Sequence, residues 1–187
     1  MNTLFDEPIY ADSASDAILK DKFYTPPIAL RPLLPYLRPE WRIWEPCCGG
    51  GAIVTELCSK GFDVFGTDIV EPHGRDFLTW KPEYFDAVVT NPPYSKGDDL
   101  LERCYSFAKP FAVILPVTFI GGKRRQNMFR EHGIEVIMFG ERLNFLTPTG
   151  KDHKNGSTAN FETAWFTHGL KIGAGITFST LKGLGAI

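Results

Sequence analysis

Four consecutive residues, Asn91-Pro92-Pro93-Tyr94, combine the groups needed to hold a planar amino group. The side-chain oxygen of Asn91 and the carbonyl oxygen of Pro92 can both accept a hydrogen bond from one exocyclic NH2 group. The two prolines stiffen the turn, and the Tyr94 ring offers a flat stacking surface. An amino nitrogen that donates twice keeps its lone pair directed at an incoming electrophile. We therefore interpret these four residues as catalytic.

The position of this tetrapeptide strengthens the interpretation. It directly follows an apolar run, residues 85–90, that is typical of a buried strand. In α/β folds, ligands bind beyond the carboxyl ends of the strands. A strand end is therefore where a catalytic turn is expected.

A second motif lies earlier in the chain, where residues 45–51 read Glu-Pro-Cys-Cys-Gly-Gly-Gly between an expected strand and an expected helix. Glycines there let the backbone approach a ligand closely, and the helix N-terminus adds a positive dipole end. Asp68 follows Gly49 by nineteen residues and ends the next expected strand, where a carboxylate can bind a ribose diol. The third glycine of the dinucleotide fingerprint would fall at Val54, so the pattern favours a nucleoside cofactor other than NAD.

Together these motifs resemble the S-adenosylmethionine-dependent DNA methyltransferases that methylate amino groups, especially those specific for adenine N6. The likeness covers roughly residues 23–167 and keeps the order of cofactor motif before catalytic motif. It implies S-adenosylmethionine as cofactor. The residues that the resemblance assigns to cofactor binding are Tyr24, Thr25, Pro26, Glu45, Pro46, Cys47, Gly49, Gly51, Asp68, Ile69, Asp76, Phe77 and Asn91.

The resemblance also implies a substrate, the N6 amino group of adenine in DNA. A base inside a duplex cannot reach such a pocket, so base flipping or a single-stranded target is required. Tyr94 would then stack on the extruded base. Phe145 and the segment 160–162, which includes Phe161, fall where the family packs an aromatic ring against the target base.

Basic residues near the motifs are candidates for contacts with nucleic acid. Lys123, Arg124 and Arg125, with Arg130 one turn further on, could contact phosphates, or could form a solvated helix face. A second basic group flanks a loop that could close over DNA or be a plain surface loop; it consists of Arg142, Lys151, His153 and Lys154.

Other readings remain open. The same chemistry could act on RNA, on cytosine N4 or on a protein glutamine amide, although cytosine-N4 enzymes more often have Ser as the first motif residue. The chain could also be a non-catalytic subunit that binds cofactor or nucleic acid for a partner. Both motifs are intact, which favours an enzyme.

The pattern of elements predicts an α/β fold: a single-domain, Rossmann-like class I methyltransferase fold with about seven mostly parallel strands and helices on both faces. We expect an N-terminal arm over 1–22, a catalytic domain over 23–170 and a tail over 171–187. Helices are expected over 26–37, 52–60, 98–109 and 123–132, and strands over 42–45, 62–67, 76–78, 85–90, 111–115, 134–139 and 161–167. On the helix over 52–60, the residues expected to face inward are Ile53, Val54, Leu57 and Cys58.

Composition is that of a soluble globular protein, with 187 residues, 43% hydrophobic and 22% charged. The formal net charge of −2 gives little long-range attraction for DNA phosphates. We therefore expect a homodimer or a partner subunit to supply target recognition. No signal peptide or membrane span is visible, so a cytoplasmic protein is expected. The four cysteines and the histidines lack metal-ligand spacing, so we expect reduced thiols and no metal.

Overall fold

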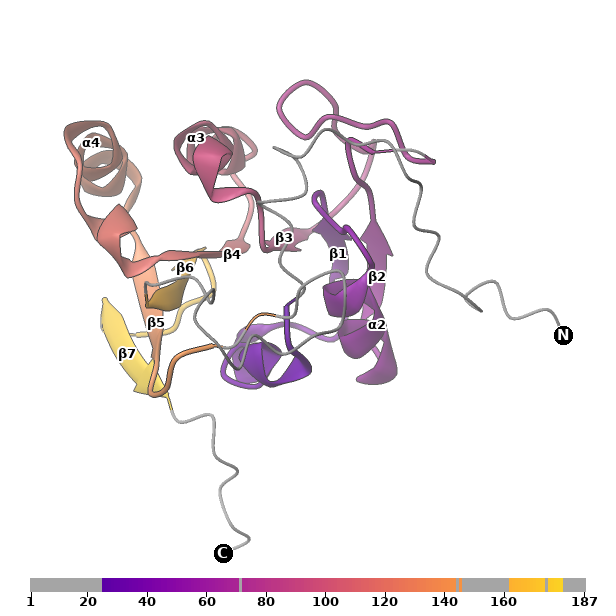
Figure 1. Ribbon diagram of the computed structural model, residues 1–187, viewed down its shortest axis with the longest axis horizontal. Coiled ribbons are helices and arrows are strands. Elements are labelled where there is room, and N and C mark those ends of the chain that lie inside the picture. Colours follow the sequence, from indigo (N-terminus) through magenta and orange to yellow (C-terminus); the bar gives the residue numbers. More distant parts are fainter. Residues whose placement is uncertain (1–24, 71, 144, 146–161, 174, 180–187) are drawn as a thin grey trace, which may run out of the picture.

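The computed structural model describes residues 25–70, 72–143, 145, 162–173 and 175–179. Figure 1 shows a sheet with helices on both sides. The strands are β1 (Arg42–Glu45), β2 (Asp63–Gly66), β3 (Ala87–Thr90), β4 (Phe111–Pro116), β5 (Glu135–Phe139), β6 (Thr163–His168) and β7 (Ile176–Ser179). The helices are α2 (Ala52–Ser59), α3 (Gly97–Ser106) and α4 (Lys123–His132), with 3-10 turns η1 (Pro27–Leu30), η2 (Leu34–Tyr36), η3 (Tyr94–Lys96) and η4 (Val117–Ile120).

The seven strands form one sheet in the order β2-β1-β3-β4-β6-β5-β7. All neighbouring pairs are parallel except those of β6, which runs antiparallel to β4 and β5. From β1 the chain goes outward to β2 on one side and then to β3 on the other. The strand order therefore reverses between β1 and β3, and such a switch point leaves a crevice beyond the strand ends. The expected fold class is confirmed.

Two apolar layers pack against the sheet. Figure 1 shows α3 and α4 on one face, and α2 with the η1 segment on the other. The first layer packs Leu101 of α3 with Trp44 and Phe166, and the second packs Leu57 of α2 with Ile43. Because both faces are covered, the central strands are mostly apolar, and all residues of β3 and β4 are buried. The carboxyl ends of β1 and β3 are thereby held rigidly side by side.

The expected strand over 76–78 is wrong. The Asp76 carboxylate accepts a hydrogen bond from the Leu78 N–H at 2.9 Å, and the Asp76 carbonyl accepts one from the Trp80 N–H at 2.7 Å. These local bonds close a turn, which asparagine and aspartate side chains favour over a strand. Phe77 is buried, with its ring centroid 5.3 Å from that of Trp44.

Three further expectations need correction. The helix expected over 26–37 is divided into η1 and η2, because Pro32 and Pro35 cannot donate to a regular helical ladder. On α2, Ile53 and Leu57 are buried, but Val54 is half-buried and Cys58 is exposed. Part of the tail expected over 171–187 belongs to the sheet, since β7 pairs in parallel with β5.

Within the described part of the chain, none of the helices is both long enough and apolar enough to cross a bilayer.

Candidate functional site

A tight glycine-rich loop connects β1 to α2 at the switch point. Gly49 and Gly51 have φ values of 48° and 76°, which side chains rarely adopt. The loop is fixed at Cys48, whose N–H donates to the Thr67 carbonyl at 2.9 Å and whose carbonyl accepts from the Gly51 N–H at 2.7 Å. A Cβ added at Gly49 or Gly51 would project into open space, so backbone conformation and not packing requires glycine here. The loop leaves the N-terminus of α2 open toward a ligand.

Asp68, which follows β2, lies directly against this loop. Its Oδ2 accepts a hydrogen bond from the Gly49 N–H at 2.8 Å, and its Oδ1 accepts one from the Val70 N–H at 3.0 Å. The carboxylate is half-buried, so each oxygen retains capacity for a further donor. The sequence predicted that Asp68 lies at this edge of the sheet, and its hydrogen bond to the glycine-rich loop was not predicted.

Glu45, the last residue of β1, is a buried carboxyl group with 2% of its surface exposed. Its Oε1 lies 3.4 Å from the Thr90 hydroxyl, while Oε2 has no hydrogen-bond partner among the described residues. Burial raises the pKa of Glu45 well above its ordinary value; Thr90 and the Asn91 backbone lower it, and the Asp68 charge raises it. A buried carboxyl oxygen without a partner is costly, and a cationic ligand would satisfy it.

The other expected cofactor residues surround this pair with differing exposure. Ile69 is 63% exposed, a large apolar side chain available to cover a planar ligand. Asp76 is half-buried, whereas Phe77 is buried in the core. Thr25 is 5% exposed, and the carbonyl of Pro26 accepts from the Ala29 N–H as η1 begins. Tyr24 lies outside the described residues.

Pro46 is buried and Cys47 is half-buried at the start of the loop. All four cysteines are free, with Cys104 buried and Cys58 exposed. Burial, followed by the Glu45 charge, raises the pKa of Cys48 to about 12, and the pKa of Cys47 also lies well above its ordinary value for the same reasons. Both thiols are therefore protonated near neutral pH, which is unsuited to nucleophilic catalysis.

The tetrapeptide that the sequence predicts to be catalytic, residues 91–94, begins directly after β3. Asn91 and Tyr94 are half-buried, Pro92 is buried and Pro93 is exposed. Tyr94 begins η3, and its ring packs in part against the apolar layer beneath α3. The backbone of Asn91 contacts the Glu45 carboxyl group. The two sequence motifs, 46 residues apart between Glu45 and Asn91, thus meet at adjacent strand ends.

The basic residues of α4 have mostly intramolecular partners. Arg124 donates to Asp99 at 2.8 Å and to Glu102, while Arg125 pairs with Asp98 at 2.6 Å. Lys123 is exposed and makes no ion pair with the described residues. Arg142 pairs with Glu162 at 3.2 Å. Phe161, Asn160, Lys151, His153 and Lys154 lie outside the described residues.

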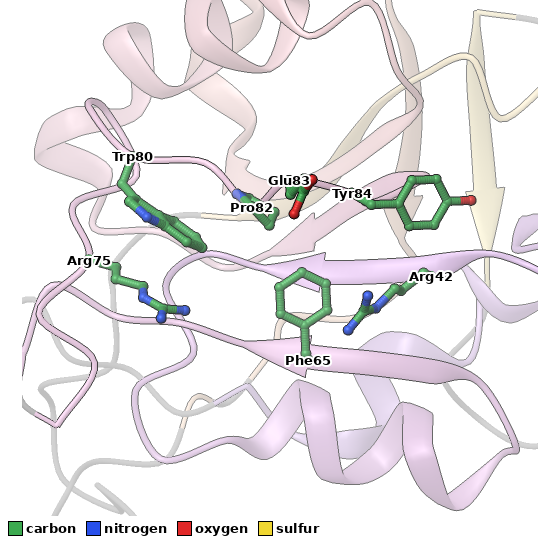
Figure 2. Close-up of a pocket in the computed structure, with 7 residues that line it drawn as sticks. All are labelled: Arg42, Phe65, Arg75, Trp80, Pro82, Glu83 and Tyr84. Carbon is green, nitrogen blue, oxygen red and sulfur yellow. The ribbon is translucent and has the colours of Figure 1, made fainter.

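A surface pocket of about 600 Å³ lies elsewhere, at the β2 edge of the sheet. Figure 2 shows the guanidinium groups of Arg42 and Arg75 on either side of Phe65, with Trp80 and Tyr84 on the loop above. The Arg42 guanidinium lies 4.9 Å from the Phe65 ring centre, and that of Arg75 lies 4.4 Å from the Trp80 ring centre. Glu45, Asp68 and Asn91 do not line this pocket, so it is separate from the site at the strand ends.

One polar residue of the site, Thr90, belongs to neither of the two sequence motifs. Thr90 is fully buried at the end of β3, where its hydroxyl group contacts the Glu45 carboxyl group and its backbone leads into Asn91. A polar side chain in the otherwise apolar run Ala87-Val88-Val89 is the signal that could have singled it out. In the described part of the chain, no three His, Cys, Asp or Glu side chains are grouped so that they could hold a metal ion.

Comparisons with known proteins bear on the fold and on part of the sequence. No protein-family model matches the chain. The modification methylase CviBIII of Paramecium bursaria Chlorella virus NC1A is 35% identical over 77 residues, and the match covers 30% of this chain and 20% of that methylase. The matched segment is thus well under two thirds of the curated relative.

Two solved structures show the same fold at low sequence identity. A protein from Listeria monocytogenes, described as a class I S-adenosylmethionine-dependent methyltransferase, has a TM-score of 0.55 at 13% identity, over 90% of this chain and 68% of that one. The methyltransferase subunit of a type I restriction-modification system from Streptococcus thermophilus has a TM-score of 0.52 at 19% identity, over 81% of this chain and 46% of that one. The class I methyltransferase fold is therefore confirmed. Over the matched 77 residues, the chain also resembles a modification methylase.

Proposed function

We propose that the protein is a cytoplasmic DNA methyltransferase that transfers a methyl group from S-adenosylmethionine to the N6 amino group of adenine. The observation that carries this proposal is the meeting of the two motifs at the switch point. Asn91-Pro92-Pro93-Tyr94 leaves β3 beside the carboxyl group of Glu45, which ends β1. A donor site and an acceptor site at adjacent strand ends are what a group transfer requires.

The residues of the first strand end fit the proposed cofactor. Its methionine part carries an ammonium group, for which the unpartnered Oε2 of Glu45 is a buried acceptor. Its ribose hydroxyls suit the half-buried carboxylate of Asp68, and its adenine suits the exposed side chain of Ile69. When bound, the sulfonium supplies an electrophilic methyl group.

The residues of the second strand end act on the target base. The Asn91 side-chain oxygen and the Pro92 carbonyl would accept from one amino group and hold its nitrogen lone pair toward the methyl group. Adenine N6 is a weak nucleophile because this lone pair is delocalised into the ring. Catalysis would then come from orientation and from fixed acceptors. Tyr94 would stack on the flipped base.

A partner would recognise the target sequence. The chain has a formal net charge of −2, and the described ion pairs occupy Arg124 and Arg125. The Streptococcus thermophilus protein that shares the fold is a subunit of a larger system. A partner subunit or a second copy of the chain would add the contacts that select a DNA sequence.

The decisive experiment follows the methyl group. The purified protein is incubated with methyl-labelled S-adenosylmethionine and, separately, duplex DNA, single-stranded DNA, RNA and protein, after which nucleosides are separated by mass spectrometry. We expect label in N6-methyladenine from DNA, with single-stranded DNA used at least as readily as duplex because unstacking costs less. Label in N4-methylcytosine, in RNA alone or in protein alone would overturn the proposal.

A further inference from the structure

Thr90 places a polar group at the centre of the site. It is the last residue of β3, it has no exposed surface, and it directly precedes Asn91. Its Oγ1 lies 3.4 Å from Oε1 of Glu45 on the neighbouring strand. This distance is long for a hydroxyl donor, so the contact is a weak one with room to tighten.

Packing alone does not explain a threonine at this position. Valine has nearly the same shape and would avoid the cost of burying a hydroxyl group. The three residues before Thr90 in β3 are Ala and Val, and Val88 and Val89 fill the two apolar layers on either face of the sheet without polar atoms. The hydroxyl group thus stands where its nearby acceptors are the Glu45 carboxyl group and the Cys47 thiol.

The surroundings of Glu45 explain what such a donor does. Burial disfavours the ionised carboxylate, and the negative charge of Asp68 adds to that effect. The neighbouring thiols of Cys47 and Cys48 are protonated and add no charge near neutral pH. The groups that favour ionisation are the Thr90 hydroxyl, at the end of β3, and the backbone of Asn91, the residue that follows β3.

We infer that Thr90 is a positioning residue, whose hydroxyl group turns Oε1 of Glu45 toward β3 and leaves Oε2 ready for the ammonium group of the cofactor. This inference rests on the proposed cofactor site. It also makes Thr90 a link between the two motifs, since one residue touches the cofactor acid and carries the catalytic Asn91. Without the hydroxyl, Glu45 would hold its proton to higher pH and bind a cation less well.

The test is calorimetric titration of the full chain with S-adenosylmethionine at several pH values. The variants are Thr90→Val, which removes the hydroxyl group, and Thr90→Ser, which keeps it. The matched control is Thr167→Val: Thr167 is also fully buried in a strand, and its hydroxyl donates to the Glu135 carbonyl at 3.2 Å, outside the site.

We expect Thr90→Val to bind about tenfold more weakly, the low end for losing a hydrogen bond to a charged group. The loss should shrink as pH rises, because the remaining Glu45 carboxyl group then ionises without help. Thr90→Ser and Thr167→Val should bind like the parent. If Thr90→Val does not fold, Thr90→Ser and Thr90→Ala are compared instead, each in the parent and in the Glu45→Gln background. A loss of cofactor affinity in Thr90→Ala that disappears in the Glu45→Gln background supports the link between Thr90 and Glu45.

Equal losses in Thr90→Val and Thr90→Ser, or a loss independent of pH, would overturn the inference in favour of simple packing. Parent-level binding by Thr90→Val would overturn it as well. Failure of the proposed function is seen separately: a parent that binds S-adenosylmethionine but does not methylate adenine leaves the role of Thr90 standing. A parent that does not bind this cofactor removes both.

Discussion

The Asp68 carboxylate accepts a hydrogen bond of 2.8 Å from the backbone N–H of Gly49, so the residue expected to bind ribose also holds the glycine-rich loop. The same carboxylate accepts from the Val70 N–H at 3.0 Å. Its removal therefore acts twice, on the ligand and on the backbone that surrounds the ligand. Hydrogen bonds to a charged acceptor are worth about 1.5–3 kcal/mol.

We predict that Asp68→Ala weakens S-adenosylmethionine binding by at least about 1.5–3 kcal/mol, measured by calorimetry. Asp68→Asn, which keeps one oxygen acceptor, should lose less. The control is Asp63→Ala, at the start of β2, whose exposed carboxylate pairs with Arg42 at 3.7 Å. Unchanged affinity in Asp68→Ala would remove Asp68 from the cofactor site.

Gly51 gives a prediction about backbone strain. Its φ of 76° is in the left-handed region, where a side chain costs roughly 1–2 kcal/mol. Gly51→Ala should lower the free energy of unfolding by about that amount in urea titrations. The control is Gly175→Ala, because an added Cβ at Gly175 also meets nothing within 4 Å but its φ is not in that region. Equal stability of the two variants would contradict the strain.

Glu45 gives a prediction about pH. Burial raises its pKa in the folded protein above the unfolded value, so the folded state holds the proton more tightly. Stability from this group is present below the unfolded pKa and is lost as pH rises through the folded pKa. In the cofactor-free protein, the stability of Glu45→Gln relative to the parent should therefore increase across that window and then level off. Urea unfolding at a series of pH values measures this, and a constant difference would contradict it.

Lys123 and Arg124 are adjacent in the sequence but differ in their ion pairs. Lys123 is exposed without an ion pair among the described residues, whereas Arg124 contacts Asp99 and Glu102. If α4 meets DNA, Lys123→Ala should weaken binding and reduce the salt slope by about one unit. Arg124→Ala should change both less. Fluorescence anisotropy with a labelled oligonucleotide measures these effects, and a larger loss in Arg124→Ala would show that its ion pairs open on binding.

Much of this architecture is readable from local sequence signals. The helix over 123–132 agrees with its expected bounds because Gly122 and Gly133, both with positive φ, delimit it. The turn at residues 91–94 follows β3 as expected, since two prolines cannot continue a strand ladder. The Gly49–Asp68 spacing identified two residues that are hydrogen-bonded in the structure. In each case the feature depends on residues close together in the sequence, or on a spacing typical of nucleoside-binding folds.

The differences arise where distant contacts or side-chain bonds decide. The strand expected over 76–78 is replaced by a turn because the Asp76 carboxylate binds the backbone two residues on. β7 pairs with β5, about forty residues earlier, and nothing in its short Ile176–Ser179 sequence specifies that partner. Thr90 acquires its place in the site only because β3 and β1 are adjacent, which a linear pattern does not reveal.

The most direct test of amino-group methylation is single-turnover methyl transfer by Asn91→Ala, with S-adenosylmethionine affinity measured on the same sample. The side-chain oxygen is lost, but the backbone contact with Glu45 stays. Asn127→Ala, an exposed amide on α4 that accepts from Arg130, is the control. Because the Asn91 backbone, which faces the expected cofactor site, is retained, we predict a cofactor affinity close to that of the parent. The rate should fall by about 10²–10³, the usual cost of one oriented hydrogen bond in a closed site. A parent-level rate in Asn91→Ala would contradict the assignment of the catalytic turn.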